Sequence, residues 1–387
     1  MKKKVLLYLS ATPNYGGIFN YCIFILQYFY RINNIDLTVI YSTKLYEKYL
    51  NNKSTNILIK KKSYIKLKII LYYIYNIIFF KKILKKIFTI FVNTKKNNYD
   101  CIFFLSHELI LFPSNKSKII SVIHDLMHIK YNSQFREYNK YSFFLRNFLF
   151  SNIIKNSNLL ISDSLQGKNE ILRNYRIKKK IKVIPYIPII NKNQKINYKM
   201  LKKNSLDKNF LFYPAKFWDH KNHKNLIGAF ALLNQKKYKD IKLVLTGDLE
   251  SKLYFELKEI ISKNLLNDKI LILGQISNNQ IYSLYKKALA LVYVSLIGPT
   301  NIPPLEAQIL KCPVICSNLH SAKLQLGKSA ILINPLKVND IYESICKIID
   351  NKKLRRSLIK KGSENIKDKL KKNNITKIIE GIIFNEK

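Results

Sequence analysis

The sequence predicts an α/β protein made of two doubly wound domains, each built on a parallel sheet. Short apolar runs rich in Val, Ile and Tyr alternate with longer amphipathic stretches along most of the chain, which is typical of strand–helix units. The length of 387 residues suits two or three domains with cores of their own. A polar stretch rich in Lys and Asn, residues 191–208, separates the two halves. We therefore expect an N-terminal domain over residues 1–190, a linker over 191–208 and a C-terminal domain over 209–370.

The first domain opens with a strand, a glycine-containing loop and a helix over residues 19–30, the usual start of a doubly wound sheet. Gly16 and Gly17 lie in that loop, where they either approach a ligand or only form a tight turn. No Gly-x-Gly-x-x-Gly sequence follows the strand, which argues against a dinucleotide cofactor. The strands expected in the first domain are residues 5–10, 37–41, 100–106, 119–123 and 159–164.

Residues 63–92 combine many Tyr, Phe and Ile with lysines, four of which, Lys81, Lys82, Lys85 and Lys86, have the spacing i, i+1, i+4 and i+5. These lysines fall on one face of a helix. The segment is therefore either a basic helix that contacts an anionic membrane surface or an outer helix of a Lys-rich protein. The longest uncharged apolar stretch, residues 69–80, is shorter than the ~20 residues that a membrane span needs. We predict no transmembrane helix.

His124 directly follows the strand over residues 119–123, at the edge where parallel sheets bind ligands. A histidine there is either a structural residue or one that contacts the substrate. His124 and His128 have the i, i+4 spacing of a metal pair, but no third ligand is evident, so we predict no metal site.

The second domain repeats the strand, loop and helix pattern after the Pro-containing segment 182–188. Alternation of this kind gives a parallel sheet through right-handed crossovers. The strands expected there are residues 210–215, 242–246, 270–273, 289–294, 314–317 and 331–333.

Two lysines follow the first strand of that domain. Lys216 and Lys221 flank Trp218 and precede a helix that starts near Asn222. Fixed positive charge and a helix N-terminus can neutralise a diphosphate without a metal ion, and the sequence contains no Asp-x-Asp pair. In a chain so rich in Lys, the alternative is that both are surface residues.

The stretch from residue 288 to 317 is the most informative part of the chain. A buried strand leads into a loop, Gly298 to Asn301, and then Pro303 and Pro304 fit the first turn of a helix. Glu306 lies near the start of that helix. Its carboxylate either interacts with the helix dipole or binds two adjacent hydroxyls of a ligand such as a ribose.

The sequence GPTNIPPLEA, followed by PVICSN and preceded by FYPAKFWDHKNHKNL and LVLTG, resembles the donor-binding half of family-four (group 1) retaining glycosyltransferases. The resemblance covers roughly residues 210–365. It implies the GT-B fold, in which two Rossmann-like domains face each other across a cleft, with residues 371–387 packing back on the first domain as a helix. The family carries two glutamates eight positions apart. Glu306 matches the second, and Gly298 stands where the first is expected.

The resemblance also implies roles for individual residues. Glu306 is expected to bind the nucleotide ribose, and Lys216, which stands in place of a usual Arg, acts with Lys221 on the diphosphate. His124 is expected to contact the transferred sugar, while Gly16 and Gly17 approach the donor phosphates or the acceptor. The remaining donor-binding residues are implied to be Gln275 and Ile276 beside the base, and Gly298, Thr300, Asn301 and Ile302 beside the sugar.

By this resemblance we expect an enzyme, a metal-independent retaining glycosyltransferase with no cofactor. It is expected to move a hexose-type sugar from a nucleotide-diphosphate sugar to a growing polysaccharide, such as a lipopolysaccharide, or to a lipid-linked glycan. The alternatives are a noncatalytic subunit that has kept the fold, which the missing first Glu favours, and a nucleotide-sugar epimerase.

The composition restricts partners and location. A formal charge of +44 suggests an anionic partner, yet the lysines are spread along the chain and no nucleic-acid-binding signature accompanies them, so we expect no nucleic acid. The five cysteines are scattered and are expected to be reduced thiols. The N-terminal apolar run is too short for a signal peptide. We therefore expect a cytoplasmic protein, peripheral on the inner face of the membrane if residues 63–92 contact lipid.

Overall fold

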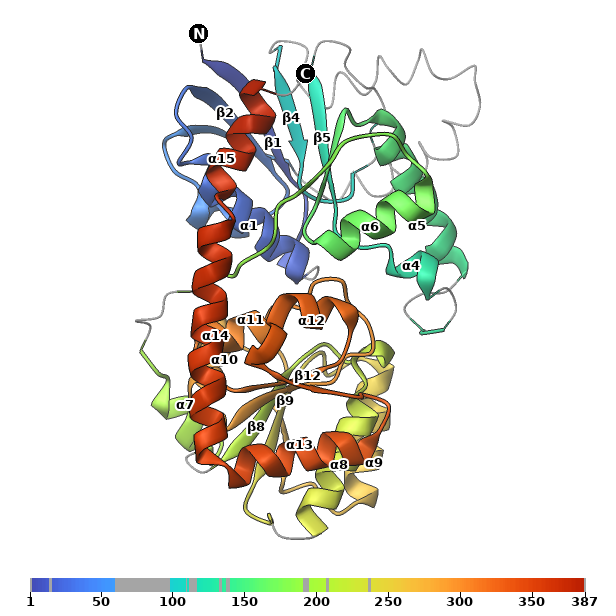
Figure 1. The fold of residues 1–387 in the computed structure, drawn as a ribbon, viewed down its shortest axis with the longest axis vertical. Coiled ribbons are helices and arrows are strands. Elements are labelled where there is room, and N and C mark those ends of the chain that lie inside the picture. Colours follow the sequence, from blue (N-terminus) through green and yellow to red (C-terminus); the bar gives the residue numbers. More distant parts are fainter. Residues whose placement is uncertain are drawn as a thin grey trace. The chain divides into compact units, whose positions relative to one another are not determined.

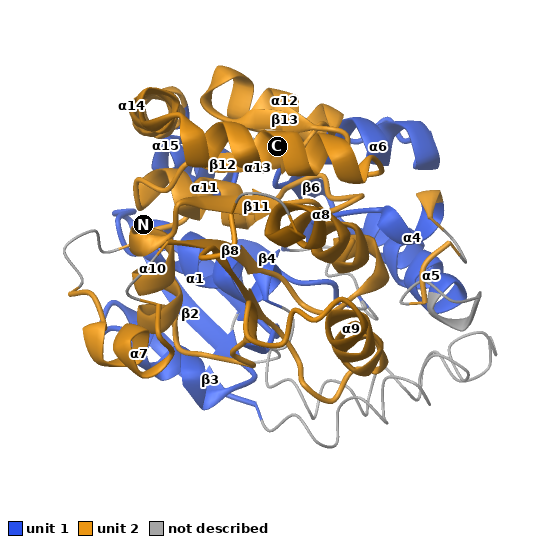
Figure 2. Ribbon diagram, turned by 90° about the horizontal axis from the view of Figure 1, so that it is seen from below, with its two compact units in different colours: residues 1–129, 143–186, 373–387 blue, residues 130–142, 187–372 orange. Residues whose placement is uncertain are grey.

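The computed structural model of the chain describes residues 2–13, 16–59, 98–108, 110, 117–131, 134–136, 140–190, 195–206, 209–235 and 238–385. The segment 63–92, for which a basic helix is predicted, lies outside these residues. The chain forms two compact units (Figure 2). The first contains residues 1–129, 143–186 and 373–387, and the second contains residues 130–142 and 187–372.

The first unit is built on a seven-stranded sheet of parallel strands in the order β3-β2-β1-β4-β5-β6-β7 (Figure 1). The bounds are β1 (Lys3–Leu9), β2 (Ile35–Tyr41), β3 (Ser54–Leu58), β4 (Cys101–Phe104), β5 (Lys118–Ile123), β6 (Leu159–Ser162) and β7 (Ile181–Val183). The sequence did not predict β3 and β7. Strand β3 is mostly exposed at the sheet edge, and β7 has only three residues within the Pro-containing segment.

Helices and the C-terminal segment cover this sheet. The bounds are α1 (Gly17–Phe29), α4 (Met127–Lys130), α5 (Lys140–Asn156), α6 (Leu165–Tyr175) and α15 (Ile375–Glu380), with short helices η2 (Lys44–Tyr49) and η6 (Gly381–Asn385). Helix α1 packs against α15. The Lys118 ammonium donates to the carbonyl of Ile382 at 2.9 Å, which ties the end of the chain to β5.

The second unit has a six-stranded parallel sheet in the order β10-β9-β8-β11-β12-β13. The bounds are β8 (Phe210–Pro214), β9 (Lys242–Thr246), β10 (Ile270–Ile272), β11 (Ala290–Tyr293), β12 (Val314–Ser317) and β13 (Ile331–Ile333). All six strands coincide with predicted ones to within one or two residues. The predicted α/β class with two doubly wound parallel sheets is confirmed.

Helices lie on both faces of the second sheet. The bounds are α7 (Tyr198–Lys203), η4 (Asp219–Lys221), α8 (His223–Gln235), α9 (Lys252–Lys263), α10 (Asn278–Lys287), α11 (Ile302–Ile309), α12 (His320–Leu326), η5 (Gly327–Ser329), α13 (Val338–Asp350) and α14 (Lys352–Lys372). Helix α8 packs against α9 and α13, whereas α11 packs against α10 and α14. Helix α7 falls inside the stretch predicted as a linker, and Asn197 at its start donates its N–H to the Ser283 hydroxyl on α10 at 2.9 Å. No described helix has the length and apolar character needed to cross a membrane.

Two glycines in the second unit differ in the space that a methyl group would find. A Cβ on Gly247, directly after β9, would lie 2.6 Å from the ring of the buried Phe217. A Cβ on Gly228, within α8, would meet Val338 at 3.6 Å, an ordinary contact distance. The ring of Phe217 is held between His223 and Tyr254, so it has little room to move.

We therefore expect Gly247→Ala to lower the free energy of unfolding by about 1–3 kcal/mol through overpacking. Gly228→Ala should raise it by up to about 1 kcal/mol, because alanine favours a helix interior. Urea unfolding followed by the fluorescence of Trp218, the single tryptophan, reports on this unit. Equal midpoints for the two variants would contradict the packing described for Phe217.

Candidate functional site

The strand order of the second sheet reverses between β8 and β11, which are neighbours although β9 and β10 separate them in sequence. The loops that follow two such strands leave in opposite directions, and the carboxyl edge between them is where open parallel sheets bind ligands. Lys216 and Lys221 follow β8, and the loop Gly298 to Asn301 follows β11. Lys216, Lys221 and this loop thus flank the reversal point.

Lys221 is held by several contacts around its backbone and its ammonium. Its carbonyl accepts the Tyr213 hydroxyl at 2.6 Å, and the next residue, Asn222, has a left-handed backbone with φ of 59°. The Lys221 ammonium lies 3.1 Å from the Tyr293 hydroxyl and 3.4 Å from the Ser295 hydroxyl. No carboxylate of the described residues forms an ion pair with it. The charge is therefore positioned by neutral groups and stays available for an anion.

Asn222 explains why the turn has this shape. Its side-chain amide donates to the carbonyl of Val294 at 3.2 Å and to that of Pro335 at 2.7 Å. Asparagine tolerates the left-handed region better than most residues. This side chain ties the end of the turn to the residue after β11 and so fixes Lys221 at the reversal point.

Lys216 lies two residues beyond β8 and is half-buried. Burial lowers the pKa of its ammonium, and the Asp248 carboxylate partly opposes this shift. The ammonium lies 5.1 Å from the centre of the Trp218 ring, which is 44% exposed. This cation–π contact holds the ammonium beside an exposed aromatic face at the end of β8.

The two histidines of this segment have structural positions. His220 is buried, and its carbonyl accepts from the N–H of Leu296 at 2.8 Å. His223 is also buried, and burial followed by the nearby charge of Lys221 lowers its pKa to about 3. The imidazole of His223 is therefore neutral and adds no charge to the site.

Arg136 reaches this turn from residues 130–142, which belong to the second unit. Its guanidinium donates to Asp219 at 2.7 Å from Nε and to Glu256 at 2.7 Å from Nη1. This hydrogen bonding is the main reason that the pKa of Asp219 is lowered. Arg136 thus neutralises a carboxylate two residues before Lys221. Sequence reasoning missed it because the partners are 83 and 120 residues apart.

Glu306 is the fifth residue of α11, so it lies beyond the first turn. The interpretation as a helix-dipole partner depended on a first-turn position and does not fit this helix. The Tyr285 hydroxyl donates to the Glu306 carboxylate at 3.1 Å. Burial raises the pKa of Glu306 to about 7, an effect that the Tyr285 hydrogen bond partly offsets. A desolvated carboxylate with one protein donor retains lone pairs for the hydroxyls of a ligand.

The loop before α11 has one conformation that requires glycine. Gly298 has a φ of +144°, and a Cβ there would lie 2.4 Å from the side-chain oxygen of Asn301. Asn301 is the N-cap of α11 but makes no capping bond, because Pro303 and Pro304 have no N–H to offer. Its buried carboxamide instead accepts the Tyr293 hydroxyl at 3.1 Å. The side chain of Asn301 thus fills the space next to residue 298.

Gln275 and Ile276 follow β10. Gly274, just before them, has a φ of +67° and accepts the Gly247 N–H at 3.2 Å, so the turn is joined to the end of β9. Ser277 then begins α10 with a capping box that includes Gln280. Thr300 lies in the loop before α11, and Ile302 is the first residue of that helix. All predicted donor-site residues of the second unit therefore follow β8, β10 or β11.

In the first unit, Gly16 precedes α1 with a φ of +49°, and its N–H donates to the carbonyl of Pro13 at 2.8 Å. Gly17 is the first residue of the helix. A tight turn is therefore present, and a Cβ on Gly16 would meet no atom of the described residues within 4 Å. Glycine is required here by the backbone conformation and not by the packing.

His124 follows β5 and is 5% exposed. Its Nδ1 lies 3.3 Å from the Asp163 carboxylate, and its Nε2 lies 3.0 Å from the carbonyl of Leu105. Because a carbonyl only accepts, Nε2 carries a proton in that contact. Both ring nitrogens thus have partners within the first unit, and Asp163 fixes the orientation of the ring.

His128 is fully buried, neither of its ring nitrogens has a hydrogen-bond partner among the described residues, and burial lowers its pKa to about 4. In the described part of the chain, no three His, Cys, Asp or Glu residues are grouped as a metal site requires. Metal independence of the reaction remains a prediction.

The sequence interpretation missed a polar group at the carboxyl edge of the first sheet. The Ser10 hydroxyl contacts the Ser106 hydroxyl and the Glu108 carboxylate, and Glu108 is 6% exposed. Ser10 directly follows β1 and Ser106 follows β4, the strands between which the order reverses. The available signal was therefore the position of polar residues after two apolar runs. Tyr285 and Tyr293 were missed because buried tyrosines look like core residues in a sequence.

Most of the second unit is similar to a known protein family. Residues 194–365 match the family described as Glycosyl transferases group 1. A Salmonella typhimurium protein named O-antigen chain mannosyltransferase RfbU is 29% identical over 189 residues, which cover 49% of this chain and 50% of that protein. The uncharacterized glycosyltransferase MJ1069 of Methanocaldococcus jannaschii is 27% identical over 311 residues, 74% of each chain. The chain thus matches half the length of the first relative.

Solved structures have the same fold. A glycosyltransferase from Rickettsia africae has a TM-score of 0.69 and 18% identity over 100% of both chains. HepE from Anabaena, in complex with UDP and glucose, has a TM-score of 0.70 and 16% identity, over 99% of this chain and 98% of that one. At these low sequence identities, the similarity shows that the folds are alike and nothing more. The chain thus has the two-domain GT-B fold of these structures, and residues 194–365, somewhat less than half of it, are similar to group 1 glycosyltransferases.

Proposed function

We propose that the protein transfers a hexose-type sugar, with retention of configuration, from a nucleotide-diphosphate sugar to a growing polysaccharide or a lipid-linked glycan. The observation that carries the proposal is the position of Lys221 at the reversal of the second sheet, with an ammonium oriented by neutral hydroxyls. Relatives support the substrate classes. HepE structures contain UDP and UDP-glucose, and RfbU is named for O-antigen mannosyl transfer.

Each part of the donor has a group that suits it. Lys216, Lys221 and the N-terminus of α8, which follows Asn222, supply positive potential for the diphosphate. The Glu306 carboxylate accepts hydroxyls of the ribose, and backbone groups at Gln275 and Ile276 are assigned to the base. The loop Gly298 to Ile302 is assigned to the sugar, with backbone N–H groups as donors.

The chemical step develops negative charge on the departing diphosphate. The bond between the anomeric carbon and the phosphate oxygen breaks, the acceptor oxygen bonds to the same face of the sugar, and the departing phosphate takes the acceptor proton. Lys216 and Lys221 stabilise the developing charge because they are already oriented and partly desolvated. This assignment needs no divalent cation and no covalent sugar–enzyme intermediate.

The sugar end of the site is neutral in this proposal. The family pattern has a carboxylate at position 298, whereas here a carboxamide from Asn301 occupies the adjoining space. A carboxamide both donates and accepts hydrogen bonds, while a carboxylate only accepts them. Donor choice should therefore differ from that of relatives with the glutamate.

The acceptor side is assigned to the carboxyl edge of the first sheet, where Gly16, Gly17 and His124 follow their strands. His124 is proposed to contact the transferred sugar, with Asp163 as the residue that orients it. We place the protein in the cytoplasm, peripheral to the membrane, because lipid-linked acceptors would be presented there.

Purified protein should be tested against UDP-, GDP-, ADP- and dTDP-sugars by thermal shift, and then by transfer to glycan acceptors. A single preferred donor together with transfer supports the proposal. Donor binding without transfer to any acceptor, but with interconversion of the sugar, indicates an epimerase. Absence of binding to every donor indicates a noncatalytic subunit and overturns the proposal.

Lys221→Ala should lower kcat by about 100-fold or more, equivalent to roughly 3 kcal/mol of transition-state stabilisation. Lys258→Ala is the matched control. Lys258 is an exposed lysine in the middle of α9, a helix that carries no residue assigned to the donor, so its loss should change kcat by less than about threefold. Steady-state kinetics with the preferred donor checks both. Unchanged kcat in Lys221→Ala would remove this residue from the mechanism.

Donor binding should weaken as the pH falls through 7, because the pKa of Glu306 is raised to about 7 by burial and only the ionised carboxylate accepts two hydroxyls. The Kd of the preferred nucleotide sugar should rise by about tenfold between pH 8 and pH 6. Calorimetric titration at several pH values measures it. Glu306→Gln, which keeps the shape and removes the titration, should bind weakly with a flat profile. A variant profile as steep as that of the wild type would assign the pH dependence to another group.

A further inference from the structure

Positive charge is concentrated on one helix of the second unit. Helix α14 has 21 residues, of which ten are Lys or Arg and two are acidic. The helix directly before it, α13, has the opposite balance, with Asp340, Glu343 and Asp350 against Lys347. On α9, two glutamates accompany three lysines. Lysine is abundant throughout the chain, yet the excess of positive charge is larger on α14 than on α13 or α9.

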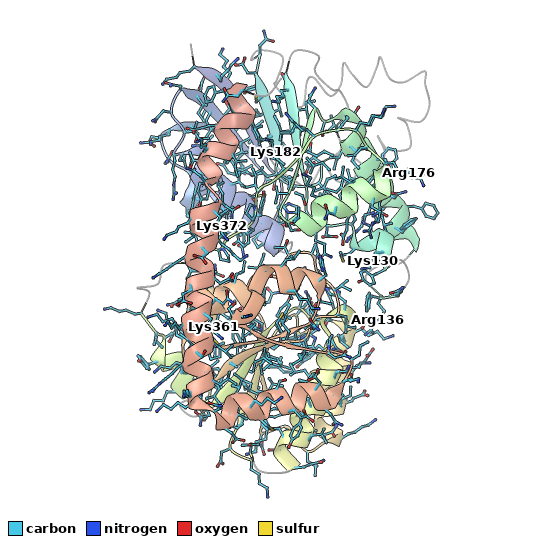
Figure 3. All side chains as sticks on the ribbon, in the orientation of Figure 1. Lys130, Arg136, Arg176, Lys182, Lys361 and Lys372 are labelled. Atoms are coloured by element: carbon cyan, nitrogen blue, oxygen red, sulfur yellow. The ribbon has the colours of Figure 1, made fainter. Side chains whose placement is uncertain are left out.

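The basic residues of α14 form a stripe. With 100° per residue, Lys352, Arg356 and Lys360 at successive fourth positions lie close to one line. The full stripe consists of Lys352, Lys353, Arg356, Lys360, Lys367 and Lys371, all exposed. The acidic Glu364 and Asp368 lie at one border of it. Lys361 and Lys372 continue the positive surface beyond that border (Figure 3).

The opposite side of α14 is fixed to the donor-binding unit. Leu358, Gly362 and Ile366 are buried, and a Cβ on Gly362 would lie 3.0 Å from the side chain of Gln308 on α11. The Asn365 amide also donates to the Gln308 side chain at 2.8 Å. Because α11 carries Glu306, the stripe and the ribose-binding carboxylate belong to one packed pair of helices.

We propose that the α14 stripe is a docking surface for an anionic membrane. Six basic side chains in a row over about 30 Å match a plane of acidic headgroups. Each basic side chain near such a surface raises the affinity by about a factor of five. Leu370, which is 50% exposed, lies within the stripe and offers an apolar contact. The helix has no aromatic residue on which a nucleobase could stack, which favours lipid over single-stranded nucleic acid.

Adsorption through α14 would hold the donor-binding unit in one orientation at the lipid surface. Membrane docking through α14 does not depend on which sugar and base are bound or on whether the configuration is retained, because it depends only on the charge and packing of one helix. It also involves a different part of the chain from residues 63–92.

The experiment is vesicle flotation of the full chain. Vesicles of phosphatidylcholine alone are compared with vesicles that contain roughly 30% phosphatidylglycerol, at low salt and at about 0.5 M NaCl. The stripe variant Lys352→Glu/Arg356→Glu/Lys360→Glu is compared with Lys252→Glu/Lys258→Glu/Lys263→Glu on α9. Both variants change three exposed lysines or arginines and shift the net charge by the same amount. Circular dichroism and thermal unfolding verify that each variant is folded.

We expect wild-type protein to bind only the anionic vesicles and to be released by salt. The stripe variant should lose binding at least tenfold, and the α9 variant should stay within about threefold of wild type. An equal loss in both variants would mean that total charge, not the stripe, determines adsorption, and would overturn the proposal. So would binding of a labelled polyuridine that depends on the stripe without binding of vesicles.

Discussion

The donor-side edge of this protein depends on the hydroxyl group of Tyr293, the last residue of β11. This hydroxyl lies 3.1 Å from the Lys221 ammonium and 3.1 Å from the side-chain oxygen of Asn301. The ammonium can only donate and the carboxamide oxygen can only accept, so the hydroxyl accepts from one and donates to the other. One buried side chain therefore orients both a charge after β8 and the loop after β11. It joins the two sides of the point at which the strand order reverses.

The strands of the second unit could be predicted because each is a short apolar run bounded by Gly, Pro or polar residues. The same reasoning failed for β3, whose residues are polar and exposed at a sheet edge, and for α7, a short Lys-rich helix inside a stretch that resembles a linker. Both elements are defined by pairing or packing with distant residues. Local composition carries no such information.

The candidate site also combines residues that the local sequence predicts with residues that it does not. Lys216, Lys221 and Glu306 were predictable, because each follows an apolar strand at the ligand-binding edge. Their partners were not. Tyr293 contacts Lys221 from 72 residues away, and Tyr285 contacts Glu306 from 21 residues away. Asp163 and Arg136, which contact His124 and Asp219, were missed for the same reason. Glu306 also lies further into its helix than the helix-dipole interpretation requires, because the helix already begins at Ile302. A pattern identifies a candidate residue, while the fold determines which side chains hold it in place.

The arrangement of Gly298 and Asn301 has an evolutionary consequence. Any side chain at position 298 would collide with the carboxamide, and the positive φ disfavours it further. Two consecutive prolines meanwhile leave that carboxamide without a capping partner, so it stays turned into the loop. A lineage with this loop can regain an acidic residue at 298 only if position 301 changes first or at the same time. Ancestral forms should therefore show the two positions exchanged as a pair.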